Sequence, residues 1–169
     1  LVIANADDPV VTELLPTVGR TFLTFGIDAE ADYRALNITT DGLMTHFEVV
    51  RPNQANLKVT VSMPGRHNVL NALAVVALSD HLGVDDGSLV KALSEFQGVG
   101  RRFQLTGFIE NEGQQIPVID DYGHHPKELE VTFDAVRDAY PGRRLVSVFQ
   151  PHRYSRTQDL FDDFVSVLN

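Results

Sequence analysis

Hydrophobic and polar residues alternate along much of the first third of the chain. Residues 57–63, LKVTVSM, place an apolar side chain at every second position, which is typical of a half-buried β-strand. Two more strand-like runs lie within residues 36–50, on either side of Asp41–Gly42, and an Asp-Gly pair favours a hairpin turn. This part of the chain is therefore predicted to be rich in strands. Shorter apolar runs predict strands at residues 1–4 and 21–25 and a short helix at residues 10–15.

A helical pattern follows at residues 66–82. Its middle, VLNALAVVAL at residues 69–78, is apolar nearly all round, so we expect a helix that is buried on most sides and ends at Gly83. Asn68 and Asn71 are three residues apart and therefore share a face of the first turn. A buried amide needs a hydrogen-bond partner. The pair thus predicts either a helix cap at Asn68 or a ligand with donor and acceptor edges.

Glycines mark a candidate domain boundary after a second helix. Residues 88–96 have helical periodicity and follow a capping residue, Asp85 or Asp86. The segment 97–100 then carries two glycines in four residues, and the pattern of the sequence changes after it. We therefore expect one domain to end and another to begin there.

Strands and helices alternate beyond this boundary. Residues 103–119 predict a hairpin and residues 126–139 a helix. LVSVF at residues 145–149 predicts a compact buried strand, and the helix after it has Ser155 and Gln158 as a capping box. Repeated units of strand, polar loop and helix predict an α/β domain with a parallel sheet. Both polar loops are then expected at the same edge of that sheet.

The two polar loops contain most of the side chains suited to chemistry. VIDDYGHHP, residues 118–126, lies between the end of a predicted strand and the start of a helix, where open α/β sheets bind ligands. QPHRYSR, residues 150–156, adds another histidine and two arginines. Eleven of the fourteen basic residues of the chain are arginines, whose rigid forks match carboxylates and phosphates.

Three kinds of chemistry are compatible with these side chains. Metal-dependent hydrolysis is disfavoured, because adjacent residues rarely ligate one ion and nearby arginines repel a cation. Acid–base catalysis by a histidine suits neutral pH, but no nucleophile is evident. One of the two adjacent histidines could instead cap the helix that follows. Binding of a phosphate or carboxylate uses the most residues and is favoured. The metal hypothesis draws on Asp120, Asp121, His124, His125 and His152, the acid–base hypothesis on His124 and His125, and the anion hypothesis on Arg102, Arg153 and Arg156.

Composition narrows the classes of function. The chain has 169 residues, a net charge of −9 and no cysteine, which excludes a disulfide framework and a thiolate metal site. A nucleic-acid binder needs a basic surface, so no nucleic-acid partner is expected. No apolar run is long enough to span a bilayer and no secretory signal is present, so the default expectation is a cytoplasmic location without membrane binding. Both ends of the sequence suggest cuts through a larger protein, and we expect a fragment.

Four motifs occur along the chain in a characteristic order: GRHNVLNALA at residues 65–74, GVGRRFQ at 98–104, DDYGHHP at 120–126 and VFQPHRYSRT at 148–157. Together they resemble the Mur ligases of peptidoglycan synthesis, and the resemblance covers essentially the whole chain. It implies an α/β fold in which residues 1–98 are the later part of the central ATPase domain. Residues 99–169 are then the first part of the Rossmann-like C-terminal domain.

The resemblance also implies substrates. DDYGHHP with FQPHRYSRT is similar to members that take UDP-N-acetylmuramate and L-alanine, and a member that takes a tripeptide is the alternative. In the family reaction, ATP activates the carboxylate of the sugar nucleotide to an acyl phosphate, which the amine of the amino acid attacks. The residues implied for ATP are Asn68 and Asn71 at adenine, Arg102 at the phosphates and Asp121 at the ribose. Those implied around the amino acid are His124, His125, His152, Arg153 and Arg156.

Part of the family's machinery is absent from residues 1–169. There is no Gly-Lys-Thr phosphate loop, and the glutamate and histidine that hold Mg²⁺ in the family lie upstream of the matching motifs. Phosphoryl transfer depends on that lysine and on Mg²⁺ to neutralise charge. We therefore expect the Mg²⁺ ligands outside this chain and no ligase activity from the chain alone. A non-catalytic nucleotide- or anion-binding module is the other class of function.

Overall fold

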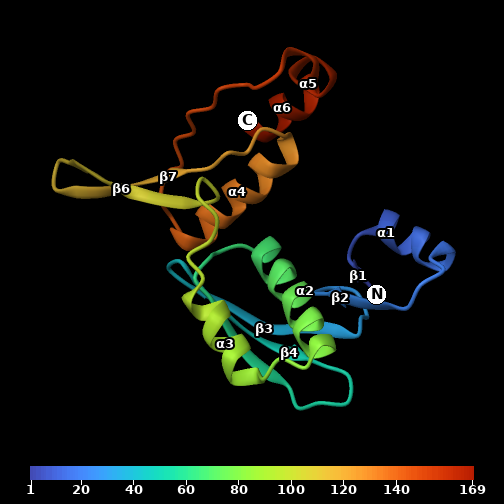
Figure 1. Cartoon of the computed structure of the whole chain (residues 1–169). Coiled ribbons are helices and arrows are strands. Elements are labelled where there is room, and N and C mark those ends of the chain that lie inside the picture. Colours follow the sequence, from blue (N-terminus) through green and yellow to red (C-terminus); the bar gives the residue numbers. More distant parts are fainter. The chain divides into compact units, whose positions relative to one another are not determined.

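The computed structural model describes residues 1–169 and divides them into two compact units, Leu1–Phe96 and Gln97–Asn169 (Figure 1). Both units contain helices and strands, as the predicted α/β fold class requires. Neither unit has a helix with the length and apolar character needed to cross a membrane. The elements of the first unit are β1 (Val2–Asn5), α1 (Pro9–Leu14), the 3₁₀ turn η1 (Leu15–Thr17), β2 (Phe22–Gly26), β3 (Tyr33–Asp41), β4 (Met44–Val50), β5 (Leu57–Val61), α2 (Arg66–Leu82) and α3 (Asp86–Glu95).

The first unit is built on a five-stranded sheet in the order β1-β2-β3-β4-β5. β1, β2 and β3 run parallel, whereas β3, β4 and β5 pair antiparallel through consecutive connections. Gly42, in the turn between β3 and β4, has φ +57°, a conformation that glycine adopts readily. β5 buries Leu57, Val59 and Val61 and exposes the residues between them more. The hairpin and the period-2 strand predicted here are therefore confirmed.

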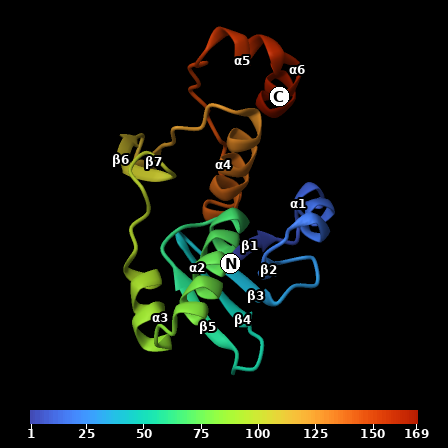
Figure 2. The same cartoon turned by 45° about the vertical axis from the view of Figure 1, so that its right-hand side comes forward.

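Helix α2 lies across one face of the sheet, with α3 beside it (Figures 1 and 2). Val69, Leu73 and Val76 of α2 are fully buried in the core that the sheet provides. The expectation of burial on most sides is confirmed only in part. Between residues 69 and 78, five side chains are buried and Leu70 and Ala74 are partly buried, but one strip of the helix is exposed. This strip contains Asn71 and three apolar side chains: Val75 (44%), Leu78 (45%) and Leu82 (68%).

A buried ionic cluster joins β4, α2 and α3. The guanidinium of Arg51, directly after β4, donates to Asp80 at 3.1 Å, to both carboxylate oxygens of Asp86 at 2.8 and 2.9 Å, and to the carbonyl of Ala55. The side chains of Arg51 and Asp80 are only 2% and 4% exposed. Burial, followed by the negative charge of Asp80, raises the pKa of the Tyr33 hydroxyl to about 12. The cluster thus connects three elements through specific ionic contacts, in addition to their hydrophobic packing.

Asp7 holds two loops of the sheet together. One carboxylate oxygen accepts from the backbone N–H of Ile27 at 2.8 Å, and the other accepts from Asp28 at 3.1 Å and Ala29 at 2.8 Å. A Cβ on Gly26 would lie 2.9 Å from this carboxylate, so glycine is required by the close approach. Burial raises the pKa of Asp7, but the three backbone donors outweigh it, and the net pKa is lowered from 3.8.

The second unit contains a hairpin and three helices: β6 (Gln104–Asn111), β7 (Gln114–Asp120), α4 (Pro126–Ala139), α5 (Tyr154–Asp159) and α6 (Phe161–Leu168). β6 and β7 pair antiparallel across a tight turn, in which Glu112 and Gly113 both have positive φ. The predicted hairpin and the predicted helix at 126–139 are confirmed.

The predicted parallel sheet of the second unit is wrong. Residues 145–149 form no strand, and Val146 and Val148 are 69% and 98% exposed. A parallel strand needs a neighbour for its backbone N–H and C=O groups, and the only sheet in this unit is the β6–β7 hairpin. The two polar loops therefore do not emerge from one edge of a shared sheet. The capping box at Ser155 is also wrong, because α5 begins two residues earlier than predicted, at Tyr154, and has Arg153 as its N-cap, without a side-chain bond.

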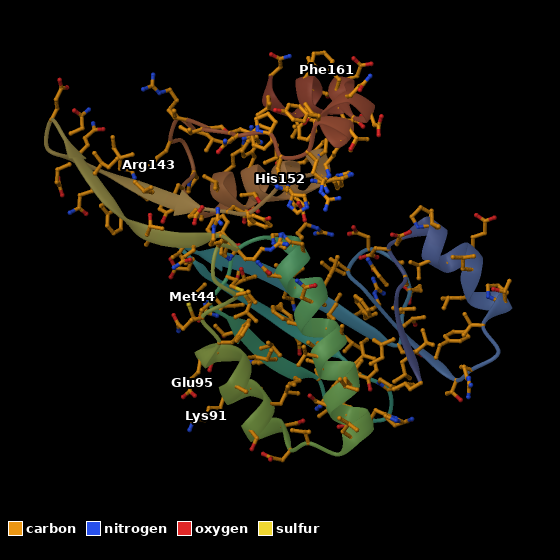
Figure 3. The ribbon with its side chains drawn as sticks, turned by 45° about the horizontal axis from the view of Figure 1, so that its top comes forward. Met44, Lys91, Glu95, Arg143, His152 and Phe161 are labelled. Carbon is orange, nitrogen blue, oxygen red and sulfur yellow. The ribbon has the colours of Figure 1, made fainter.

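Arg51→Ala should destabilise the first unit by about 3–5 kcal/mol, because it leaves the Asp80 carboxylate buried without its partner. Urea unfolding followed by circular dichroism measures the change. Lys91→Ala is the matched control, since Lys91 meets Glu95 at 4.0 Å on the exposed face of α3 (Figure 3) and should cost less than about 1 kcal/mol. Equal effects of the two substitutions would contradict a structural role of the cluster.

Asp7→Asn should remove a pH-dependent contribution to stability. Because the pKa of Asp7 is lowered in the folded chain, its contribution is fully present above its ordinary value of 3.8 and is lost as pH falls through the lowered folded-state value. The difference in unfolding free energy between wild type and variant should therefore be largest near neutral pH and shrink on acidification. Asp41→Asn, at an exposed position, serves as the control, and a difference that grows on acidification would refute the assignment.

Candidate functional site

The polar loop between β7 and α4 is organised by a helix cap. Pro126 is the first residue of α4, and His125 is its N-cap. The Nδ1 atom of His125 accepts from the backbone N–H of Lys127 at 3.2 Å, and the carboxylate of Glu128 accepts from the N–H of His125 at 3.2 Å. This reciprocal arrangement is a capping box. Of the two roles considered for the histidine pair, His125 therefore has the capping one, and its Nε2 atom stays outside the cap.

Glu128 is the most connected side chain of the site. Its Oε2 atom accepts from the N–H of His124 at 2.9 Å and lies 3.5 Å from Nδ1 of the same residue. Its Oε1 atom accepts from Arg102 at 3.4 Å. Burial is the largest single influence and raises the pKa of Glu128, but the N–H groups of His124 and His125, the His124 ring and Arg102 together lower it. The carboxylate is therefore held in its charged form.

His124 lies among aromatic and carbonyl groups. Its Nδ1 atom is 3.0 Å from the carbonyl oxygen of Tyr122, and its ring meets the Tyr122 ring edge-on with centroids 5.2 Å apart. The ring of His152, which belongs to the other polar loop and is labelled in Figure 3, has its centroid 6.4 Å from that of the His124 ring. Arg156 of α5 donates to the carbonyl of His152 at 3.3 Å. The structure thus brings His124 and His152 together, and Arg156 contacts the backbone of His152.

Asp121 braces the loop that carries Arg102. One carboxylate oxygen accepts from the N–H of Phe103 at 2.8 Å, and the other from the N–H of Gly123 at 2.7 Å. A Cβ on Gly123 would lie 2.9 Å from that second oxygen. The braced loop is unusual, since both neighbours of Arg102, Arg101 and Phe103, have positive φ values of 60° and 47°. Each oxygen of Asp121 keeps lone-pair capacity for a further donor.

Arg101 and Arg102 have different surroundings. The Nε atom of Arg101 lies 3.3 Å from Asp120, and its guanidinium lies 5.0 Å from the centre of the Tyr122 ring. Arg102 instead contacts Glu128 and is half exposed. Both arginines thus lie beside the histidine loop, but only Arg102 is joined to it through Glu128. Arg153 is exposed and has φ +70° at the start of α5.

The two asparagines of α2 belong to the first unit. Asn68 is buried, and its amide donates to the carbonyl of Pro64 at 2.8 Å. It is not the helix N-cap, which is Gly65. Asn71 is exposed, so the reasoning that a buried amide there needs a ligand does not hold. Its side chain is nevertheless accessible to one.

No group of three or more histidine and carboxylate side chains is arranged to hold a metal ion. The acids of the site instead contact backbone N–H groups and arginines. Glu128 and Tyr122 were not among the residues that sequence analysis selected. The spacing of His125 and Glu128, three residues apart around the first helical proline, is the signal that identifies Glu128, because it is the spacing of a capping box.

Both parts of the chain match families of known domains. Residues 1–79 match the Mur ligase middle domain, and residues 101–169 match the glutamate ligase domain of Mur ligases. The chain therefore belongs to the Mur ligase family. The particular member is a separate question, because several kinds of Mur ligase have similar structures.

Three solved structures illustrate this range. UDP-N-acetylmuramate-alanine ligase from Thermotoga maritima is 32% identical over 100% of this chain, with a TM-score of 0.78. A murein peptide ligase from Psychrobacter arcticus is also 32% identical, over 89% of this chain, with a TM-score of 0.61. MurF ligase from Thermotoga maritima, solved in complex with ADP, is 23% identical over 83% of this chain with a TM-score of 0.64, which shows the fold alone. The chain spans 35%, 31% and 31% of these three proteins, about a third of each.

Asp121→Ala should loosen the loop around Arg102, because it leaves the N–H groups of Phe103 and Gly123 without their acceptor. Loss of such a bond costs about 1–3 kcal/mol, so amide exchange at Phe103 and Gly123 should accelerate by about fivefold or more. Hydrogen exchange measured by NMR tests this. Asp120→Ala removes only the exposed contact to Arg101 and is the control. Unchanged exchange in Asp121→Ala would refute the bracing role.

Proposed function

We propose that this chain is part of the ATP-dependent ligase that joins L-alanine to UDP-N-acetylmuramate through an acyl phosphate, in peptidoglycan synthesis in the cytoplasm. The observation that carries the proposal is the 32% identity to the Thermotoga alanine ligase across the whole chain, with a TM-score of 0.78. The murein peptide ligase has the same identity but a smaller coverage and a lower TM-score of 0.61. A ligase for a tripeptide is therefore the second candidate.

The roles proposed at ATP are those that the resemblance to Mur ligases implies, and they are compatible with the chemistry of the four side chains. Asn71 and Asn68 are assigned to adenine, whose edge offers donors and acceptors; Asn71 is exposed, whereas the amide of Asn68 already has a backbone partner. Arg102 is assigned to the phosphates, because a half-exposed guanidinium fork fits phosphate oxygens. Asp121 is assigned to the ribose, since its oxygens retain capacity for hydroxyl donors. Arg101 is not assigned.

The proposed amino-acid site uses histidines and arginines. The carboxylate of L-alanine needs a cation, which Arg153 and Arg156 supply. Its ammonium group must lose a proton before it attacks the acyl phosphate, and an imidazole is suited to accept that proton near neutral pH. His124 and His152 lie close enough to act at one substrate. His125 contributes only through Nε2, because its Nδ1 atom caps α4.

Mg²⁺ and the phosphate loop are assigned to parts of the ligase outside residues 1–169. Magnesium ions neutralise charge on the transferring phosphoryl group in such reactions. The side chains described here would bind and orient ATP and alanine beside that centre. No nucleic-acid or membrane partner is proposed. A non-catalytic nucleotide-binding module is the alternative for the chain acting by itself.

The test is ADP release by the longer protein that contains this chain. We expect release with UDP-N-acetylmuramate, ATP and Mg²⁺ to depend on L-alanine and to exceed that with glycine or serine. Stimulation by the tripeptide alone would favour the murein peptide ligase instead. Residues 1–169 alone should release no ADP in the same mixture, and alanine-dependent release by them would contradict the assignment of the phosphate loop to another segment.

A further inference from the structure

Glu128 contacts the groups proposed for both substrates but has no role in the function proposed above. We propose that Glu128 is a positioning residue that holds the Arg102 guanidinium and the His124 imidazole in place for the ligase reaction. This inference rests on the proposed function for its enzymatic consequence. The contacts of Glu128 do not depend on the proposed function, since all of them lie within the second unit.

The two oxygens of Glu128 have separate tasks. Oε2 accepts the backbone N–H groups of His124 and His125 at 2.9 and 3.2 Å, which fixes the start of α4. Oε1 takes no part in these cap bonds and accepts from Nη1 of Arg102 at 3.4 Å. Because the cap anchors the carboxylate, the position of Oε1 is fixed as well. Arg102 therefore meets an acceptor that is itself held by the backbone.

Arg102 needs such an acceptor. Its side chain is 50% exposed and extends from a loop whose two flanking residues have positive φ. A free arginine side chain loses rotamer entropy when a ligand immobilises it. A partner that restricts the side chain beforehand reduces that loss when phosphate binds. The weak, half-exposed contact also leaves the guanidinium able to exchange one partner for another.

The carboxylate of Glu128 also contacts His124, which is proposed for the amino-acid site. Nδ1 of His124 lies between Oε2 of Glu128 at 3.5 Å and the carbonyl of Tyr122 at 3.0 Å. These two acceptors favour a proton on Nδ1 and leave Nε2 as the nitrogen that can take a proton from a substrate. One side chain thus sets the orientation of a phosphate-binding candidate and of a proton-accepting candidate.

Glu128→Gln separates positioning from capping. The amide oxygen of glutamine can replace Oε2 in the capping box, which accepts Glu or Gln equally, so the fold and melting temperature should change little. The amide nitrogen then faces Arg102, where it presents donors to a donor. Glu130→Gln is the matched control, since Glu130 lies in the same turn of α4 and is paired with Lys127 at the surface.

The first measurement does not depend on activity. In residues 1–169, the ¹⁵N heteronuclear NOE of the Arg102 Nε–H group reports the order of the side chain. We expect it to fall in Glu128→Gln and to stay at the wild-type value in Glu130→Gln. An unchanged value in Glu128→Gln would overturn the inference, whatever reaction the ligase catalyses.

The second measurement is steady-state kinetics of the longer ligase. Glu128→Gln should lower kcat/KM for ATP by about three- to fivefold, the scale of one half-exposed ion pair, and leave the KM for UDP-N-acetylmuramate unchanged. In an Arg102→Ala background the same substitution should cause a smaller loss in kcat/KM for ATP, because the part of its effect that passes through Arg102 is already absent. Full additivity of the two losses would overturn the inference. If the wild-type ligase accepts only the tripeptide, the alanine proposal fails, and the same comparison with tripeptide still tests Glu128.

Discussion

Carboxylates that accept backbone N–H groups hold the loops of both units in place. A loop leaves several N–H groups without the partners that a helix or sheet provides. Each N–H group that is buried without a hydrogen-bond acceptor costs free energy. In the first unit, Asp7 satisfies three such groups between β2 and β3. In the second unit, Asp121 and Glu128 satisfy two each. Three of the 23 acidic residues of the chain thus have a structural role in ordering loop backbone.

The same interaction changes how the candidate site is understood. The sequence presents Asp120, Asp121 and the histidine pair as a cluster of acids and bases that face a ligand. In the structure, Asp121 faces the backbone on both of its oxygens, and His125 uses one nitrogen for the helix cap. Asp121 and His125, both of which are proposed to contact substrates, therefore have structural contacts as well. Glu128, which contacts Arg102 and His124, was not among the candidate site residues selected from the sequence.

The errors of the sequence analysis have a common physical cause. Residues 145–149 have the composition of a buried strand, but a strand forms only where another strand offers hydrogen bonds, and the β6–β7 hairpin does not extend to them. Likewise, α2 is apolar on nearly every face, yet the strip that includes Val75, Leu78 and Leu82 is left exposed. Periodicity describes what a segment is able to bury. It carries no information on whether a neighbour is present to cover it.

The sequence by itself determined the elements whose signals are local: the β3–β4 and β6–β7 hairpins at their turns, α2 with its terminal glycine, α4 with its proline start, and the motifs of the Mur ligase family. These follow from backbone preferences within a few residues, so they need no knowledge of the fold. Only the tertiary structure decided that Arg51 would be buried between two aspartates, that Asp121 would brace the loop of Arg102, and that His124 would meet His152. Those contacts join residues 18 to 35 positions apart, and no local preference specifies which distant partner a charged side chain will find.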